Sequence, residues 1–299
     1  MRPAQAPLRF SWPLAGTGLL LLLGANAWWY LELRRVRWAL PVFLVAGSAA
    51  YFALLRVFCG LRWGDVSREG RFVVLSGLLL LCAFLSFGRG LRFEGILPAS
   101  RFETLYGFFY FSLSSVLLRS VLPLLAMGAL FGRRPHELGY RLRGTSRLAW
   151  IYLGLLLVVL PAVAWASTRR DFQASYPQAR GVVVDSAVPL ELFIPYQAAY
   201  FLVFLSGESF WRGYLVFGLE RDLGRMAIPW MVMLYSMSHY GKPFLETNAA
   251  ILAGSVLGWL ALRHRSFWLG VALHWTVAVA MDVAVLWRQG VPFQWRGLP

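Results

Sequence analysis

Long apolar stretches recur along almost the whole chain, and short segments that carry arginine separate most of them. A helix needs about 20 apolar residues to cross the hydrocarbon core of a bilayer. Candidate spans lie near residues 14–33, 38–58, 72–90, 106–131, 148–167, 189–217, 227–240, 247–262 and 266–287. The pattern predicts an all-α polytopic membrane protein, a bundle of about eight or nine transmembrane helices. We expect the short spans 227–240 and 247–262 to be tilted or buried within that bundle.

Composition supports the same fold class. Hydrophobic residues make up 59% of the chain and charged residues 14%, whereas soluble domains are about 45–50% apolar and about 25% charged. A soluble core of this size could not hide so many apolar side chains, so many of them must face lipid. The two cysteines are isolated in the sequence and provide neither a disulfide framework nor a metal cluster.

The net charge of +15 does not indicate a nucleic-acid partner, because the basic residues are spread over the loops between apolar stretches. Such residues anchor helix ends at lipid phosphates, so membrane lipids are the expected partner. The residues concerned include Arg34, Arg35, Arg37, Arg62, Arg68, Arg71, Arg133, Arg134, Arg141, Arg143 and Arg147. Loop charges favour a cytoplasmic N-terminus only weakly. The arginine-rich, lysine-poor composition predicts a bacterial protein of the inner membrane.

The N-terminus resembles a signal peptide, because basic residues precede an apolar run and Ala25-Asn26-Ala27 resembles a cleavage site. The apolar run continues past that site through the aromatic pair Trp28-Trp29, which is typical of a membrane interface. We therefore expect a retained first span. Four segments follow from the pattern: N-terminal transmembrane helices (1–167), a soluble loop (168–188), a helical region rich in polar residues (189–287) and a tail (288–299).

The most informative polar stretch is Ser206–Tyr214, which places Glu208 and Arg212 four residues apart inside an apolar helix. Residues at that spacing share one helical face and can pair. A charge inside a membrane costs about 2.5–3.5 kcal/mol even on the most lenient scale, so such residues are candidates for function. A purely structural ion pair between helices is the simpler alternative.

Two further spans contribute histidine. Tyr235 and His239 lie four residues apart, and His274 and Asp282 lie eight apart, so each pair shares a helical face; Glu246 follows shortly after His239. Each histidine alone is more often a hydrogen-bonding core residue than a catalyst. Together, however, buried polar groups need partners, and the nearest partners in lipid are one another. We expect a hydrated polar pocket between these helices.

A carboxylate beside two imidazoles suits acyl hydrolysis. Glu208 can take a proton from water as a general base, one histidine can orient that water, and the other can donate to the developing oxyanion. Arg212 would then offset the charge of Glu208. Two histidines and a carboxylate could instead bind zinc, but a His-Glu-x-x-His motif is absent from the sequence. A site without a cofactor is therefore the favoured interpretation.

The order of these motifs resembles the CPBP family, which includes type II CAAX prenyl endopeptidases and bacteriocin-processing or immunity (Abi) proteins. The motifs are Glu-x-x-x-Arg-Gly, an aromatic-x-x-x-His, and Ser-x-Trp-x-Gly-x-x-x-His, and the resemblance covers about residues 190–287. It implies an all-helical bundle with an intramembrane glutamic endopeptidase site. By position it implies Glu208, His239 and His274 as catalytic residues, with Arg212 and Tyr235 in support.

Two positions depart from the family pattern. Gly207 replaces the first glutamate of the usual pair, and Ala278 replaces an expected asparagine or similar group. Either Glu208 takes the role of base, or Glu246 or Asp282 replaces it, or the protein does not cleave peptides. The stretch Gly-Lys-Pro-x-x-Glu at 241–246 resembles a subgroup of the family with a single glutamate, which favours a coherent variant site.

Three functions follow, of which an intramembrane endopeptidase acting on a peptide or membrane-protein substrate is preferred. The first alternative is a non-catalytic CPBP-like membrane protein that binds a partner or confers immunity, prompted by Gly207 and Ala278. The second is a transporter whose intramembrane charges line a path, although the two halves show no inverted repeat or pair of broken helices.

Overall fold

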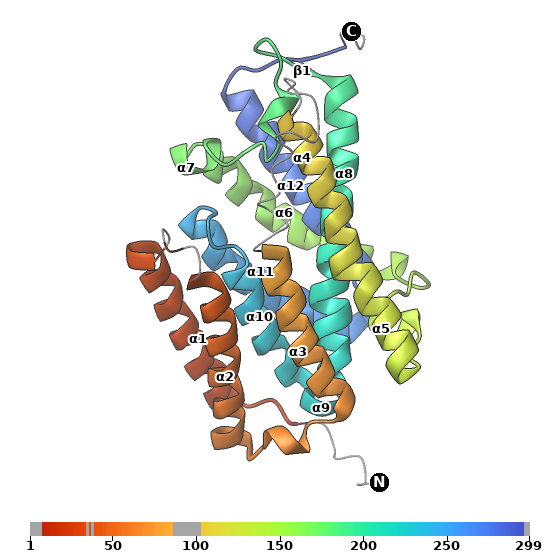
Figure 1. The fold of residues 1–299 in the computed structure, drawn as a ribbon. Helices are drawn as coiled ribbons and strands as arrows, with labels where there is room; N and C mark the ends of the chain where they lie inside the picture. The colour runs from red at the N-terminus through yellow and green to blue at the C-terminus, as the bar shows by residue number, and fades with distance from the viewer. Residues whose placement is uncertain (1–7, 34–35, 37–38, 86–102, 296–299) are drawn as a thin grey trace. The chain divides into compact units, whose positions relative to one another are not determined.

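The computed structural model describes residues 8–33, 36, 39–85 and 103–295, and its regular structure is almost entirely helical (Figure 1). The α-helices are α1 (Trp12–Trp28), α2 (Ala39–Cys59), α3 (Arg68–Ala83), α4 (Glu103–Val116), α5 (Leu122–Phe131), α6 (Ala149–Ala166), α7 (Arg170–Gln173), α8 (Leu190–Glu208), α9 (Gly218–Leu223), α10 (Ala227–Met237), α11 (Phe244–His264) and α12 (Trp268–Arg288). Three π-helical segments are η1 (Trp29–Leu33), η4 (Leu117–Val121) and η8 (Ser209–Phe217).

The remaining elements are short. Single 3-10 turns form η2 (Trp63–Asp65), η5 (Pro135–Leu138), η6 (Ser146–Leu148), η7 (Arg180–Val182) and η9 (Gly224–Met226). Strands β1 (Val188–Pro189) and β2 (Phe293–Gln294) pair in parallel. In the part of the chain that the structure describes, these two strands make the only sheet. The predicted all-α class is therefore confirmed.

Seven helical stretches in the described residues are long and apolar enough to cross a membrane. They are Trp12–Leu33, Ala39–Cys59, Glu103–Phe131, Ser146–Ala166, Leu190–Met237, Phe244–His264 and Trp268–Arg288. The 48-residue stretch Leu190–Met237 includes two of the spans expected from the sequence, 189–217 and 227–240, almost completely. Helix α3 corresponds to the expected span 72–90. Residues 86–90 of that expected span lie outside the described residues. The polytopic membrane architecture agrees with the sequence prediction.

Unit 1, one of two compact units in the chain, comprises residues 1–85, 123–141 and 209–267. Its central element is α10, which packs against α1, α2, α11 and η8 and is buried around almost its whole circumference. A helix that is apolar on all sides belongs in an interior, which explains why so short a span is stable. The prediction that 227–240 is buried is confirmed, whereas α11 is a full-length span of 21 residues.

The close packing of α10 on α11 depends on two glycines of α11 that are four residues apart. A Cβ atom on Gly254 would lie 3.0 Å from Cδ1 of Tyr235, and one on Gly258 would lie 3.0 Å from Cε of Met231. Both distances are shorter than ordinary van der Waals contact. Small residues at this spacing allow two helix backbones to approach closely within a membrane.

Unit 2 comprises residues 86–122, 142–208 and 268–299. Within it, α8 packs against α4 and α12, and α12 also packs against α6. The aromatic side chains of Phe108 and Tyr196 join α4 to α8, with ring centroids 4.9 Å apart. The parallel pair β1–β2 connects the segment before α8 to the segment after α12. Unit 2 therefore fixes α8 and α12 side by side.

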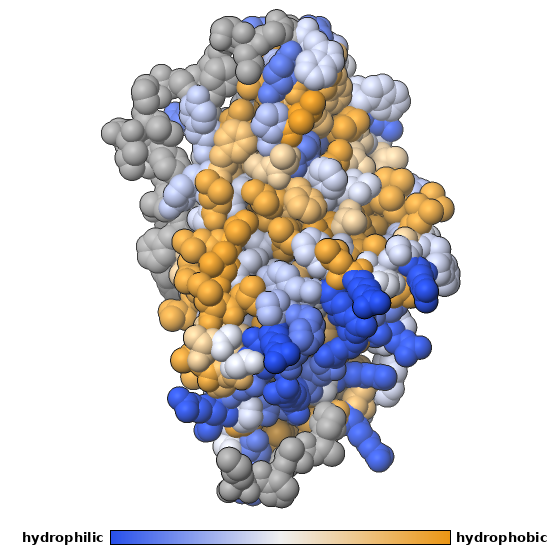
Figure 2. Space-filling view, turned by 90° about the vertical axis from the view of Figure 1, so that its right-hand side faces the viewer, coloured by the Kyte–Doolittle hydropathy of each residue, from blue (hydrophilic) through white to orange (hydrophobic). Residues whose placement is uncertain are grey.

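The outer surface of the helices is strongly apolar, and Figure 2 shows hydrophobic side chains over much of the face in view. Leu79 is 70% exposed, Val158 74% and Leu252 71%. Water would penalise so much apolar area at about 25 cal/mol per Å², whereas lipid does not. These side chains are therefore the ones expected to face lipid.

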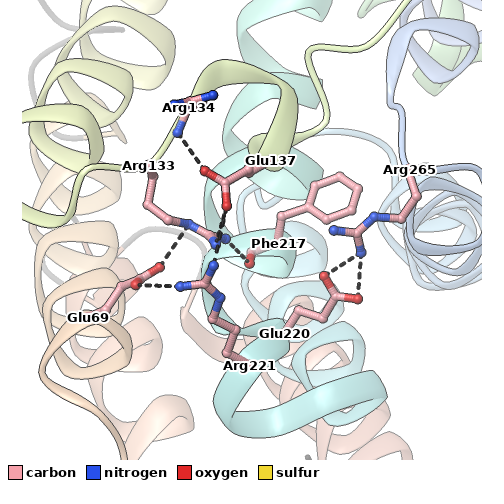
Figure 3. Close-up of polar contacts among 8 residues, drawn as sticks. All are labelled: Glu69, Arg133, Arg134, Glu137, Phe217, Glu220, Arg221 and Arg265. Atoms are coloured by element: carbon pink, nitrogen blue, oxygen red, sulfur yellow. Dashed lines mark hydrogen bonds and ion pairs between the residues drawn. The ribbon is translucent and has the colours of Figure 1, made fainter. Parts of the chain in front are cut away.

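Arg133 differs from the headgroup anchor that the sequence predicts, because its side chain is buried (Figure 3). Its Nε lies 3.1 Å from Oε1 of Glu69, and its Nη1 lies 3.2 Å from Oε1 of Glu137. Its Nη2 donates to the carbonyl of Phe217 at 3.3 Å. The reason is electrostatic: two carboxylates and a buried carbonyl draw this cation inward, which a composition argument cannot anticipate. Arg34, Arg35 and Arg37 lie outside the described residues.

Candidate active site

Glu208 lies at a change of helix type. It is the last residue of α8, and the nine-residue π-helix η8 follows it directly. Short π-helical insertions in α-helices occur frequently at functional sites, because they shift the side chains that follow relative to a regular helix. The transition therefore marks this point of the long stretch Leu190–Met237 as unusual, independently of the charge on Glu208.

The structure brings Glu208 and His274 together within unit 2. Oε1 of Glu208 lies 2.8 Å from Nδ1 of His274, although the two residues are 66 positions apart in the chain. The Glu208 side chain is 1% exposed and the His274 side chain 22% exposed. A buried carboxylate is tolerable only when it is hydrogen-bonded. The contact gives Oε1 such a bond and leaves the imidazole as the more accessible partner.

Aromatic packing fixes the imidazole. The ring of Phe204 lies 5.2 Å from the ring of His274. On the same helix as His274, Trp275 donates its Nε1–H to the carbonyl of Gln197 at 3.0 Å. Both contacts join α8 to α12, the helices that carry the acid and the imidazole. The pair is therefore held by rigid elements of unit 2, which a catalytic arrangement requires.

The hydrogen-bond chemistry constrains how this pair can hold protons. An ionised carboxylate only accepts hydrogen bonds, so it pairs with an Nδ1–H of the imidazole. A neutral His274 with its proton on Nδ1 carries the lone pair on Nε2. The pair can therefore take up a proton at either end of the contact, which suits acid–base chemistry.

The other predicted residues of the first two motifs belong to unit 1. Arg212 is fully buried, and its guanidinium carbon lies 4.9 Å from the ring centroid of Tyr235. Nδ1 of His239 lies 2.8 Å from the carbonyl oxygen of Tyr235, one helical turn earlier. Because a carbonyl only accepts, this contact requires a proton on Nδ1, and a neutral ring with that proton has its lone pair on Nε2.

Glu246 and Asp282, the two possible replacement bases, have partners of their own. Oε1 of Glu246 lies 2.6 Å from Nζ of Lys242. Oδ2 of Asp282 accepts hydrogen bonds from the hydroxyl of Tyr196 at 2.7 Å and from Nε2 of Gln197 at 2.9 Å. Asp282 is eight residues beyond His274 on α12, which is about 12 Å along a helix. Asp282 therefore lies in a separate polar cluster of unit 2.

The two positions that depart from the family pattern are both buried. Gly207 lies in the last turn of α8 and offers no side chain beside Glu208. Ala278 packs into an apolar cluster with Phe108, Tyr200 and their neighbours. A polar side chain at 278 would face that apolar cluster, so the alanine agrees with its surroundings.

Sequence reasoning missed Tyr196 and Gln197, the partners of Asp282. Gln197 offered a signal, since it is a polar residue in an apolar stretch of α8.

The structure also identifies partners of Arg119, whose side chain is buried in unit 2. The Arg119 guanidinium donates hydrogen bonds to the hydroxyl of Ser115 at 2.8 Å and to the hydroxyl of Ser206 at 3.0 Å. It also donates to the carbonyl of Val203 at 2.9 Å. These bonds join η4 to α8 near its C-terminal end.

A metal site would need several ligating side chains close together. In the residues described by the structure, no group of three or more His, Cys, Asp or Glu side chains could hold a metal ion. Zinc sites in proteins usually combine three or four such ligands.

The fold and this pair define a polytopic α-helical membrane protein with an acid–imidazole contact inside a span. Residues 189–280 match a family model described as Rce1-like, type II CAAX prenyl endopeptidase Rce1-like. The match covers almost the same residues as the resemblance to the CPBP family found in the sequence, and confirms it. It supports a protease of the CAAX type as the class of enzyme. No curated protein and no solved structure matches the chain.

Proposed function

We propose that the protein is an intramembrane endopeptidase in which Glu208 activates the water that hydrolyses a peptide bond near the membrane surface. The observation that carries this proposal is the 2.8 Å contact between Glu208 and His274 at the end of α8. The family match over residues 189–280 supports the same class of reaction. The proposed substrate is a peptide or a segment of a membrane protein, and the proposed location is a bacterial inner membrane.

In the proposed reaction, Glu208 accepts a proton from water while the water oxygen forms a bond to the carbonyl carbon of the scissile peptide. The electron pair of the carbonyl π bond moves to its oxygen, which becomes an oxyanion. When the tetrahedral intermediate collapses, the C–N bond breaks and the proton held by Glu208 passes to the leaving nitrogen. One water is consumed, and an acid and an amine are released.

His274 has two parts in this scheme. Its Nδ1–H orients the Glu208 carboxylate, and when the imidazole carries a second proton, on Nε2, that N–H donates to the oxyanion while Glu208 still accepts the proton from water. A single donor of this kind in an oxyanion hole contributes about 10²–10³ in rate. The lower burial of His274 compared with Glu208 supports this part, because the imidazole must reach the substrate.

His239 enters the proposal through the order of the sequence motifs. A proton on Nδ1, bonded to the carbonyl of Tyr235, leaves Nε2 as an acceptor, which suits a group that orients water. Arg212 is proposed to offset the charge of Glu208, which precedes it by four residues in the same helical stretch. We further propose that the reaction needs no metal ion, so that a chelator leaves the rate unchanged.

The test uses purified full-length protein in proteoliposomes with a peptide library, and mass spectrometry identifies the cleavage products. Glu208→Gln, His274→Ala and His239→Ala are compared with Glu103→Gln, which changes an exposed glutamate at the start of α4. We expect cleavage by wild type and Glu103→Gln, and a loss of at least about a hundredfold in each of the other three. Unchanged cleavage in Glu208→Gln and His274→Ala would remove the assignment.

A further inference from the structure

A pocket lies wholly within unit 1, and neither Glu208 nor His274 lines it. It has a volume of about 540 Å³, within the range of about 300–1,000 Å³ that small-molecule sites occupy. Its lining residues are Leu8, Arg9, Phe10, Glu220, Gly224, Arg225, Trp259, Leu262 and Arg263. Three arginines in one pocket attract an anion, and their surroundings indicate which kind.

The charge of this pocket is not balanced from within. Glu220 is its only acidic lining residue, and its Oε1 accepts a hydrogen bond from Nη1 of Arg265 at 2.6 Å (Figure 3). In residues 8–33, 36, 39–85 and 103–295, the guanidinium groups of Arg9, Arg225 and Arg263 have no hydrogen-bond or ion-pair partner. The pocket therefore carries an excess of positive charge.

The pocket lies where several spans begin or end. Arg9 and Phe10 lie shortly before α1, Arg225 lies in η9 shortly before α10, and Arg263 is in the last turn of α11. The ring of Phe10 lies 4.9 Å from the ring of Trp12, which is 79% exposed at the start of α1. Exposed tryptophan at the ends of spans is typical of the lipid headgroup region. The ends of spans are where lipid phosphates are expected.

The walls of the pocket combine charge with apolar surface. Leu8, Phe10 and Leu262 line it beside the arginines, and Trp259 is 49% exposed one helical turn before Arg263 on α11. A free phosphate ion gains no binding energy from apolar walls. A phospholipid presents a phosphate and, next to it, a glycerol group and acyl chains that can contact such walls. The combination of cationic and apolar walls favours a lipid as the occupant.

We propose that this pocket binds the headgroup phosphate of an anionic phospholipid, with Arg9, Arg225 and Arg263 around the phosphate and Trp259 beside the upper acyl chain. Basic pockets at the ends of transmembrane helices recognise anionic headgroups in this way. Each arginine near the membrane surface adds a similar amount to the binding free energy for anionic lipid. The site gives the protein a preference for anionic over zwitterionic lipid.

The test titrates short-chain phosphatidylglycerol into delipidated full-length protein in neutral detergent, with isothermal titration calorimetry as the readout. Phosphatidylcholine of the same chain length and glycerol 3-phosphate are titrated in parallel. We expect phosphatidylglycerol to bind at least tenfold more tightly than either. Equal affinity for the two lipids would overturn the proposal, and glycerol 3-phosphate as tight as the lipid would show a site for a free phosphate instead.

Variants locate the binding. Arg225→Gln with Arg263→Gln is expected to weaken phosphatidylglycerol binding about thirtyfold, and the matching pair of lysine substitutions is expected to retain most of it. Arg141→Gln with Arg143→Gln removes the same charge at exposed positions that do not line the pocket and is the control. Trp259→Ala is expected to weaken binding of the lipid but not of glycerol 3-phosphate. Unchanged affinity in the double glutamine variant would place the lipid elsewhere and contradict the proposal.

Discussion

The hydroxyl of Tyr196 on α8 donates a hydrogen bond to Oδ2 of Asp282 on α12, with the two oxygens 2.7 Å apart. Asp282 is fully buried and so is Tyr196. The bond lies on the same two helices as Glu208 and His274, about two turns further along α12 from His274. It therefore helps to set the relative position of α8 and α12, on which the acid–imidazole contact depends.

The variant Tyr196→Phe tests that role. Losing a hydrogen bond to a buried carboxylate is expected to lower the free energy of unfolding by about 1.5–3 kcal/mol, read as a lower melting temperature in detergent. Thr276→Val is the control, because the Thr276 hydroxyl is exposed and bonds within α12 to the carbonyl of Ala272. Equal melting temperatures for Tyr196→Phe and Thr276→Val would show that the bond does not stabilise unit 2.

A second prediction concerns the buried cation of unit 1. Arg133→Met removes the buried partner of Glu69 and a donor to the Phe217 carbonyl, and is expected to destabilise the protein by about 2–4 kcal/mol. Arg221→Met is the matched comparison, because Arg221 contacts the same two carboxylates but its side chain is 61% exposed. An exposed pair contributes less than about 1 kcal/mol. A loss in Arg221→Met as large as in Arg133→Met would contradict this account.

Glu137 and Glu69, the two carboxylates that contact Arg133, are expected to change the stability of the protein with pH in opposite directions. The backbone N–H of Arg134 donates to Glu137 and lowers the pKa of this carboxyl, with Arg133 and Arg221 adding to the effect. The stability that Glu137 contributes is therefore present above its unfolded pKa of about 4.3 and is lost as the pH falls through its lower folded value. We expect Glu137→Gln to make the acid side of a plot of melting temperature against pH less steep.

The stability that Glu69 contributes changes with pH in the opposite direction. Burial raises the pKa of its carboxyl, although Arg133 and Arg221 oppose the rise. Folding therefore favours the protonated acid, and stability decreases as the pH rises from the unfolded pKa of about 4.3 through the raised folded value. Glu69→Gln is expected to remove that decrease. Identical plots of melting temperature against pH for wild type, Glu69→Gln and Glu137→Gln would show that neither carboxyl is coupled to folding.

The helical class and the spans could be predicted from the sequence, because the length of an apolar stretch is a local property that must match the thickness of the bilayer. The sequence also singled out Glu208 and His274, since charged and polar residues inside an apolar stretch stand out without any knowledge of packing. The pairing between them was expected on the argument that buried polar groups seek one another. The 2.8 Å contact in unit 2 agrees with that argument.

Other features depended on tertiary structure. The π-helix η8 was not predicted from the sequence. The position of Asp282 beside Tyr196 and Gln197 required knowing which faces of α8 and α12 meet. The burial of Arg133 likewise depended on Glu69, which is 64 residues earlier in the chain. Such long-range partners cannot be read from spacing.

The central claim is that Glu208, and no other carboxylate, activates water. Once a cleaved peptide is known, its cleavage rate is measured for wild type, Glu208→Gln, Glu246→Gln and Asp282→Asn at equal amounts of folded protein. The account predicts a loss of at least about a hundredfold in Glu208→Gln and smaller losses in the other two variants. A rate for Glu208→Gln within about threefold of wild type, with a large loss in Glu246→Gln or Asp282→Asn, would contradict it.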